Sequence, residues 1–108
     1  MSGGDLKARL LGMSLPEDTV EIPGVGPVRV RALNRHEALS VQGLKGAEAI
    51  ERRIVSLGLV DPTMTEAEVG QWQKAAPAAL LDLVSDRIAE LSGLKDDSPK
   101  EVVKSLRG

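Results

Sequence analysis

Two kinds of hydrophobic pattern follow one another along the chain. Between residues 19 and 31, apolar side chains alternate with polar ones on both sides of a Pro-Gly-Val-Gly-Pro turn at 23–27. Alternation with a period of two indicates β-strands, so this segment is predicted to form a hairpin with one apolar face. A five-residue loop would place three pairs opposite one another: Val20 and Val30, Ile22 and Val28, and Glu21 and Arg29.

From residue 34 onward, apolar side chains recur every three or four residues, which indicates amphipathic helices. Asn34 with Glu37, and Thr65 with Glu68, have the spacing of capping boxes and predict two helix starts. Pro77 is expected to separate the second of these helices from the next one. The helix after Pro77 has the clearest pattern, and its expected core residues are Leu80, Leu81, Val84, Ile88 and Leu91.

A glycine followed by a leucine marks two expected helix ends. A helix over 47–57 is expected to end at Gly58 in a Schellman motif, with Leu59 making its hydrophobic contact. Gly93 and Leu94 repeat this signal at the end of the helix with the clearest pattern. The buried sides expected of the two earlier helices are Ala38, Leu39, Val41 and Leu44 in one, and Ile50, Ile54 and Leu57 in the other.

Two further helices are expected at the ends of the chain. Leu6, Leu10 and Leu11 lie at helical spacing behind an aspartate and predict a short helix that ends at Gly12. At the other end, residues 98–101 carry a cap, a first-turn proline and a capping-box acid. The apolar side of that terminal helix would consist of Val102, Val103 and Leu106.

These elements predict a single domain over residues 1–108. We expect a mainly α fold, a small helical domain of four to five short helices with an N-terminal β-hairpin. A flexible tail would occupy 1–4, the hairpin 19–31 and the helical part 34–107. The core must be aliphatic, because Trp72 is the only aromatic residue, and the lack of cysteine excludes disulfides and thiolate sites. The N-terminal apolar cluster is too short for a signal core or a membrane span, so we expect a soluble, unexported protein with no membrane partner.

The sequence offers no clear catalytic, cofactor-binding or metal-binding constellation, so an enzyme is not expected. His36 is the only imidazole and lies in a first helical turn without an orienting partner. Asp82, Asp86 and Glu90 are spaced by four, which a solvated helix face explains better than a cation site. Residues 61–72 begin like a calcium loop but lack its central glycine and its final glutamate.

The charge of the chain argues against nucleic acid as its partner. The formal net charge is -2, which provides no basic field for phosphates. Arg29, Arg31 and Arg35 nevertheless form a local basic cluster, so a small helical regulatory or DNA-binding protein is the alternative function. Gly24 and Gly26 lead into a strand and not into a helix, which predicts a turn instead of a phosphate-binding loop.

Apolar residues at the edges of the helical pattern are the candidates for binding another protein. Trp72 lies on an amphipathic helix, where tryptophan is either a core residue or, if partly exposed, a binding hot spot. The complete candidate set for partner binding is Leu59, Val60, Met64, Trp72, Val102, Val103 and Leu106.

Several segments, in this order, resemble those of the tail assembly chaperones of long-tailed, non-contractile bacteriophages (siphoviruses). The matching segments are EIPGVGPVRVR at 21–31, GLVDP at 58–62, MTEAEV at 64–69, AP at 76–77, IAELSGL at 88–94 and KSLRG at 104–108. The family favours an aromatic residue near the end of the chain, where this sequence has Leu106.

The resemblance implies a small, mostly helical protein that is not an enzyme and has no cofactor. Such a protein binds the tape measure protein, keeps it soluble and helps recruit tail tube subunits during tail assembly. It would act in the cytoplasm of the infected bacterial host and would be absent from the mature virion. The family has no fixed binding motif, so the resemblance adds no site residues, and it leaves open whether the chain forms a homo-oligomer.

Overall fold

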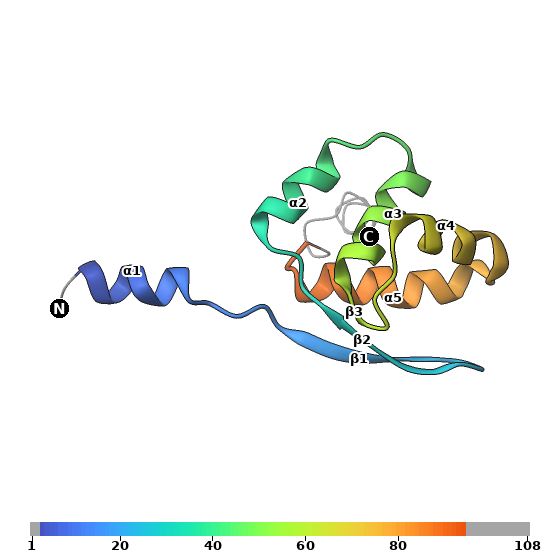
Figure 1. Ribbon diagram of the computed structural model, residues 1–108, viewed down its shortest axis with the longest axis horizontal. Coiled ribbons are helices and arrows are strands. Elements are labelled where there is room, and N and C mark those ends of the chain that lie inside the picture. The colour runs from blue at the N-terminus through green and yellow to red at the C-terminus, as the bar shows by residue number, and fades with distance from the viewer. Residues whose placement is uncertain (1–2, 95–108) are drawn as a thin grey trace, which may run out of the picture.

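In the computed structural model, which describes residues 3–94, the chain forms five helices and three strands. In chain order they are α1 (Gly3–Leu11), β1 (Glu17–Ile22), β2 (Gly26–Arg31), α2 (Arg35–Gln42), α3 (Ala47–Gly58), β3 (Leu59–Asp61), α4 (Glu66–Ala75) and α5 (Ala78–Leu91). The strands form one antiparallel sheet in the order β1-β2-β3. The sheet lies along one side of helices α2 to α5, and α1 stands apart from this body (Figure 1). The fold is therefore mixed α and β, and the predicted helix over 98–107 lies outside the described residues.

The hairpin forms as predicted, but its register differs from the expected one. Ile22 pairs with Gly26 and Val20 with Val28, two residues away from the predicted partners. The loop is shorter than expected because the chain reverses within three residues, where the amide of Val25 donates to the carbonyl of Ile22 at 2.9 Å. Gly24 and Gly26 make this tight reversal possible, because their φ values are 81° and 125°. Residues with a Cβ rarely adopt such values.

A shift of two residues leaves each side chain on its predicted face, since the strand period is two. Ile22, Val28 and Val30 are buried on the inner face, as the apolar pattern predicted. The ion pair on the outer face is different from the predicted one. Arg29 pairs with Glu17, because the observed register places Glu21 opposite Pro27.

The sequence did not predict the third strand. Leu59, expected in a helix ending, begins β3 and pairs with Val30 of β2, with an irregularity in register before the Arg29–Asp61 pair. Gly58 belongs to α3 and does not adopt the left-handed conformation of a Schellman ending. Its role is packing: a Cβ placed on Gly58 would lie 2.4 Å from Cδ1 of Ile88 in α5. Glycine at this position therefore lets α3 and α5 approach each other closely.

Two further helix boundaries differ from the prediction, because α1 begins at Gly3, within the tail expected over 1–4, and α2 ends at Gln42, before Leu44. The other boundaries agree with the local signals. Asn34 and Glu37 form a capping box at the start of α2, and Thr65 and Glu68 form one at the start of α4. A break at Pro77 separates α4 from α5. At the end of α5, Gly93 has a φ of 76° and Leu94 donates to the carbonyl of Ala89 at 2.9 Å, which completes the predicted Schellman motif.

The core lies between the inner face of the sheet and helices α3, α4 and α5. Its completely buried side chains are Val30, Val55, Val69, Val84 and Ile88. The expected core residues of α5 are confirmed. Leu81 is buried with Val84 and Ile88, and Leu80 and Leu91 are partly buried and pack against the core. In α2 the prediction was wrong for Leu39, which is 51% exposed, because the helix turns only Ala38 and Val41 into the core. The core is aliphatic, as the composition requires.

Candidate functional site

An open groove of about 450 Å³ lies between the tip of the hairpin and α4. Its floor is apolar and includes Ile22, Val28 and Leu59, all of which also belong to the core. Val25 at the hairpin tip lines one side and is 76% exposed. Met64 and Trp72 line the other side and are partly buried. The groove is thus a mainly apolar surface that the fold leaves open to solvent.

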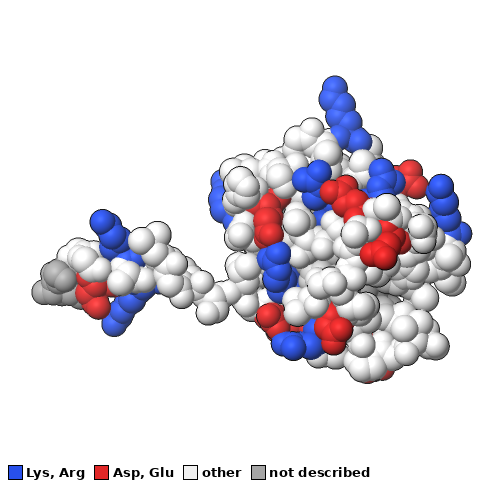
Figure 2. All heavy atoms as spheres, viewed as in Figure 1, with Lys and Arg blue, Asp and Glu red and all other residues white. Residues whose placement is uncertain are grey.

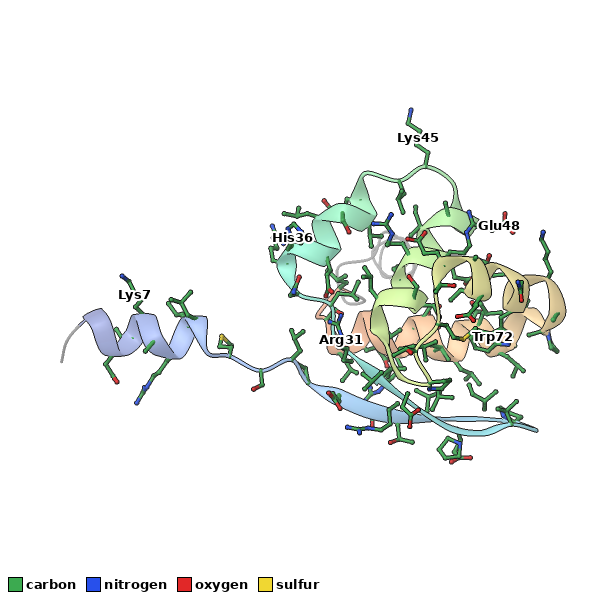
Figure 3. The ribbon with its side chains drawn as sticks, viewed as in Figure 1. Lys7, Arg31, His36, Lys45, Glu48 and Trp72 are labelled. Carbon is green, nitrogen blue, oxygen red and sulfur yellow. The ribbon has the colours of Figure 1, made fainter. Side chains whose placement is uncertain are left out.

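Short-range features of the sequence position the α4 side of this groove. The capping box of Thr65 and Glu68 fixes where α4 begins, and residues three positions apart then share a face. Val69 is completely buried, and Trp72 follows it at the margin of the core (Figure 3). Of the residues that the structure describes, Glu68 is the only charged one that lines the groove, and its carboxylate accepts from the Thr65 amide at 2.9 Å. Glu68 therefore already has a structural role.

Comparison with known proteins assigns no family to this chain. No model of a known protein family matches the sequence, no curated protein matches it, and no solved structure matches the fold. None of the helices within residues 3–94 is long and apolar enough to cross a membrane.

Three of the residues predicted to bind a partner come together in this groove. Leu59, Met64 and Trp72 line it, whereas Val60, in β3, is partly buried and does not. The other three candidates, Val102, Val103 and Leu106, lie outside the described residues. Sequence reasoning missed the contribution of the hairpin, which supplies Ile22, Val25 and Val28. The one available signal was a valine between two turn glycines, where an apolar side chain has no core to enter.

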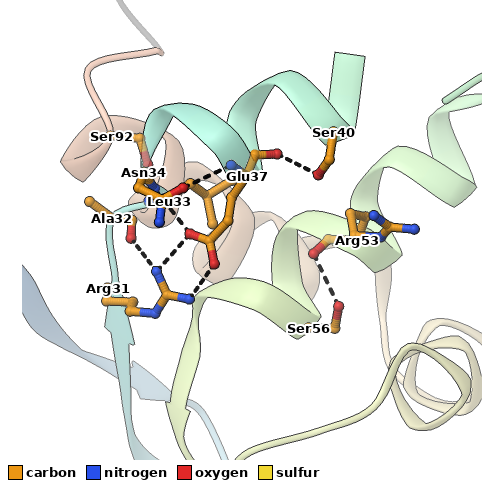
Figure 4. A network of polar contacts seen from close by, with 9 residues as sticks. All are labelled: Arg31, Ala32, Leu33, Asn34, Glu37, Ser40, Arg53, Ser56 and Ser92. Atoms are coloured by element: carbon orange, nitrogen blue, oxygen red, sulfur yellow. Dashed lines mark hydrogen bonds and ion pairs between the residues drawn. The ribbon is translucent and has the colours of Figure 1, made fainter. Parts of the chain in front are cut away.

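The three arginines of the alternative function do not form a free basic cluster. Arg29 is paired with Glu17 on the outer face of the sheet. Arg31 makes two bonds to the Glu37 carboxylate, at 2.9 and 2.7 Å, and one to the carbonyl of Ala32 at 2.9 Å (Figure 4). Arg35 is exposed at the start of α2. Two of the three cations are therefore engaged within the fold.

The other polar candidates are dispersed over the surface. His36 is exposed in the first turn of α2 and points away from the body (Figure 3). Asp82, Asp86 and Glu90 are exposed on α5, where Glu90 accepts from Arg87 at 3.1 Å. Within residues 3–94, no three carboxylates or imidazoles gather closely enough to hold a metal ion.

The Arg31–Glu37 pair joins the end of β2 to the start of α2 and makes stability dependent on pH. The bond from Arg31, aided by the Asn34 amide and opposed by burial, lowers the pKa of Glu37 below its ordinary value. A depressed pKa means that the stabilisation is present above the ordinary glutamate pKa and is lost as the pH falls through the folded value.

Replacing Glu37 with glutamine is therefore expected to lower the free energy of unfolding by about 1.5 kcal/mol at neutral pH, because the charged bonds to Arg31 are lost. Urea titrations of both proteins at neutral and at acidic pH test this. The difference between them should shrink on acidification, when Glu37 itself becomes protonated. An equal difference at both pH values would show that the charge of Glu37 contributes nothing.

Proposed function

We propose that this protein is a tail assembly chaperone of a long-tailed, non-contractile bacteriophage. It binds the tape measure protein in the cytoplasm of the infected host, keeps it soluble and helps recruit tail tube subunits, without entering the mature virion. The observation that supports this most directly is the open apolar groove between the hairpin tip and α4. The order of segments that resemble this family supports the same function.

The groove has the character of a helix-binding surface. An amphipathic helix binds by laying its apolar face into a hydrophobic groove, with anchors at spacings of three and four residues. Met64 and Trp72 offer flexible and aromatic contact surfaces on one side, and Val25 offers an aliphatic one on the other. A tape measure protein is a long helical chain that aggregates, so a chaperone for it needs a surface of this kind. A partly exposed tryptophan is also the side chain most enriched among binding hot spots.

The test is co-expression of this chain with the tape measure protein encoded beside it, scored by solubility and co-purification. Met64→Asp places a charge in the groove and is expected to weaken co-purification by at least about tenfold, the effect of losing roughly 1.4 kcal/mol. The matched control is Leu39→Asp, which adds the same charge at an exposed position on α2, away from the groove. It should bind like the wild type.

Thermal unfolding of each variant shows whether the fold is retained. If Met64→Asp folds and still keeps the tape measure protein soluble, the groove is not the binding site. If the wild type fails to bind the tape measure protein and instead binds duplex DNA at low salt, the regulatory alternative replaces this proposal.

A further inference from the structure

Helix α1 has no packing partner among the described residues. None of its residues is buried, and its three leucines, Leu6, Leu10 and Leu11, are 47%, 69% and 81% exposed. Met13 and Leu15 in the following linker are exposed as well. A helix of nine residues is marginal in water without tertiary contacts. An amphipathic helix of this length therefore needs a surface on which to dock.

We propose that α1 docks in the groove between the hairpin tip and α4 of a second copy of this chain. The groove offers an open apolar surface, and α1 offers leucines at helical spacing, which is the pattern that a hydrophobic groove accepts. Each copy has one groove and one arm, by which we mean α1 together with the linker that joins it to β1. Every arm can therefore occupy the groove of another copy.

The charges of the two surfaces are complementary. Helix α1 carries two basic residues, Lys7 and Arg9, and one acidic residue, so its formal charge is 2 − 1 = +1. Among residues 3–94, Glu68 is the only charged residue that lines the groove, and Asp61, the sequence neighbour of the lining residue Pro62, is also acidic and exposed. Figure 2 shows basic side chains on opposite sides of α1. Docking brings this basic helix to a groove whose one charged lining residue within 3–94 is acidic.

The position of α1 favours a second copy over its own groove. The chain leaves β1 at the end away from the hairpin tip, and α1 lies at the opposite end of a molecule 54 Å long (Figure 1). The carbonyl of Pro16 accepts from the amide of Ala32 at 2.9 Å, which fixes the point where the arm departs. To reach its own groove, the arm would have to reverse and run along the sheet, whose outer face is polar.

Sedimentation equilibrium of the full chain, from micromolar to millimolar concentration, tests this proposal. The average mass should rise above the 11.5 kDa of one chain as the concentration increases. Leu10→Glu on the arm should abolish the rise, because it places a carboxylate on the docking face. Val25→Lys in the groove should do the same, because it opposes Lys7 and Arg9. Both positions are exposed, so neither change disturbs the core.

Mixing the two variants gives the decisive result. Leu10→Glu retains a working groove and Val25→Lys retains a working arm, so the mixture should form a complex of two chains and nothing larger. Leu39→Glu, at an exposed leucine on α2, is the control and should associate like the wild type. A wild type that stays monomeric at every concentration, variants that still associate, or a mixture that forms no complex would each overturn the proposal. The experiment contains no tape measure protein, so its outcome is independent of the proposed function.

Discussion

Replacing Gly58 with valine is expected to lower the free energy of unfolding by about 3 kcal/mol, at the upper end of overpacking effects. A Cβ at this position would lie 2.4, 2.7 and 2.9 Å from three side-chain carbons of Ile88. Ile88 has no exposed surface and cannot rotate out of the way, since the surrounding core is already filled. The clash would therefore push α3 and α5 apart, and urea unfolding measures the cost.

A control at an unobstructed glycine is Gly43→Ala at the end of α2. Gly43 has a φ of −77°, and a Cβ there would meet nothing closer than 3.8 Å. Alanine should fit and change the free energy of unfolding by less than about 1 kcal/mol.

A second-site change tests the mechanism directly. Ile88→Val removes Cδ1, the atom nearest to the new Cβ, and should cost about 1 kcal/mol on its own. In the Gly58→Ala background, Ile88→Val should cost less than it does in the wild type, because it removes the nearest of the three close contacts. Additive effects of the two substitutions would show that Gly58 is not held by its contact with Ile88.

Features of this fold that depend on neighbouring residues were predictable from the sequence. The capping boxes at Asn34 and Thr65 satisfy amides within the same turn, so their signal is complete in four residues. The break at Pro77 and the left-handed Gly93 are equally local. Inner and outer faces of the hairpin were also predictable, because a period of two leaves them unchanged when the register shifts by two residues.

Features that depend on distant residues were not predictable. Gly58 and Gly93 are both followed by leucine, yet Gly93 ends its helix with a positive φ and Gly58 does not. The difference arises from Ile88, thirty positions further along than Gly58, which packs against Gly58 and which no local pattern reveals. Strand β3 is similar, because three residues become a strand only beside the open edge of β2.

The candidate groove combines both kinds of feature. Met64 and Trp72 were found because they are apolar residues at the edge of a helical pattern. The contribution of the hairpin tip depends on β3, which brings the start of α4 alongside Ile22 and Val25. Since β3 was not predicted, its consequence for the site was not predicted either. The groove therefore forms only in the tertiary structure, from residues that belong to separate hydrophobic patterns in the sequence.

Replacing Ile22 with alanine is expected to lower the free energy of unfolding by about 2 to 4 kcal/mol, since Ile22 is only 2% exposed and belongs to the core. Val25→Ala, three positions away and 76% exposed, is the control and should change stability by less than about 0.5 kcal/mol. The urea midpoint should fall for the first variant without a change in the slope of the transition. A midpoint that does not move would mean that the inner face of the hairpin is not packed on the helices. In that case the floor of the groove would also be absent, because Ile22 belongs to both.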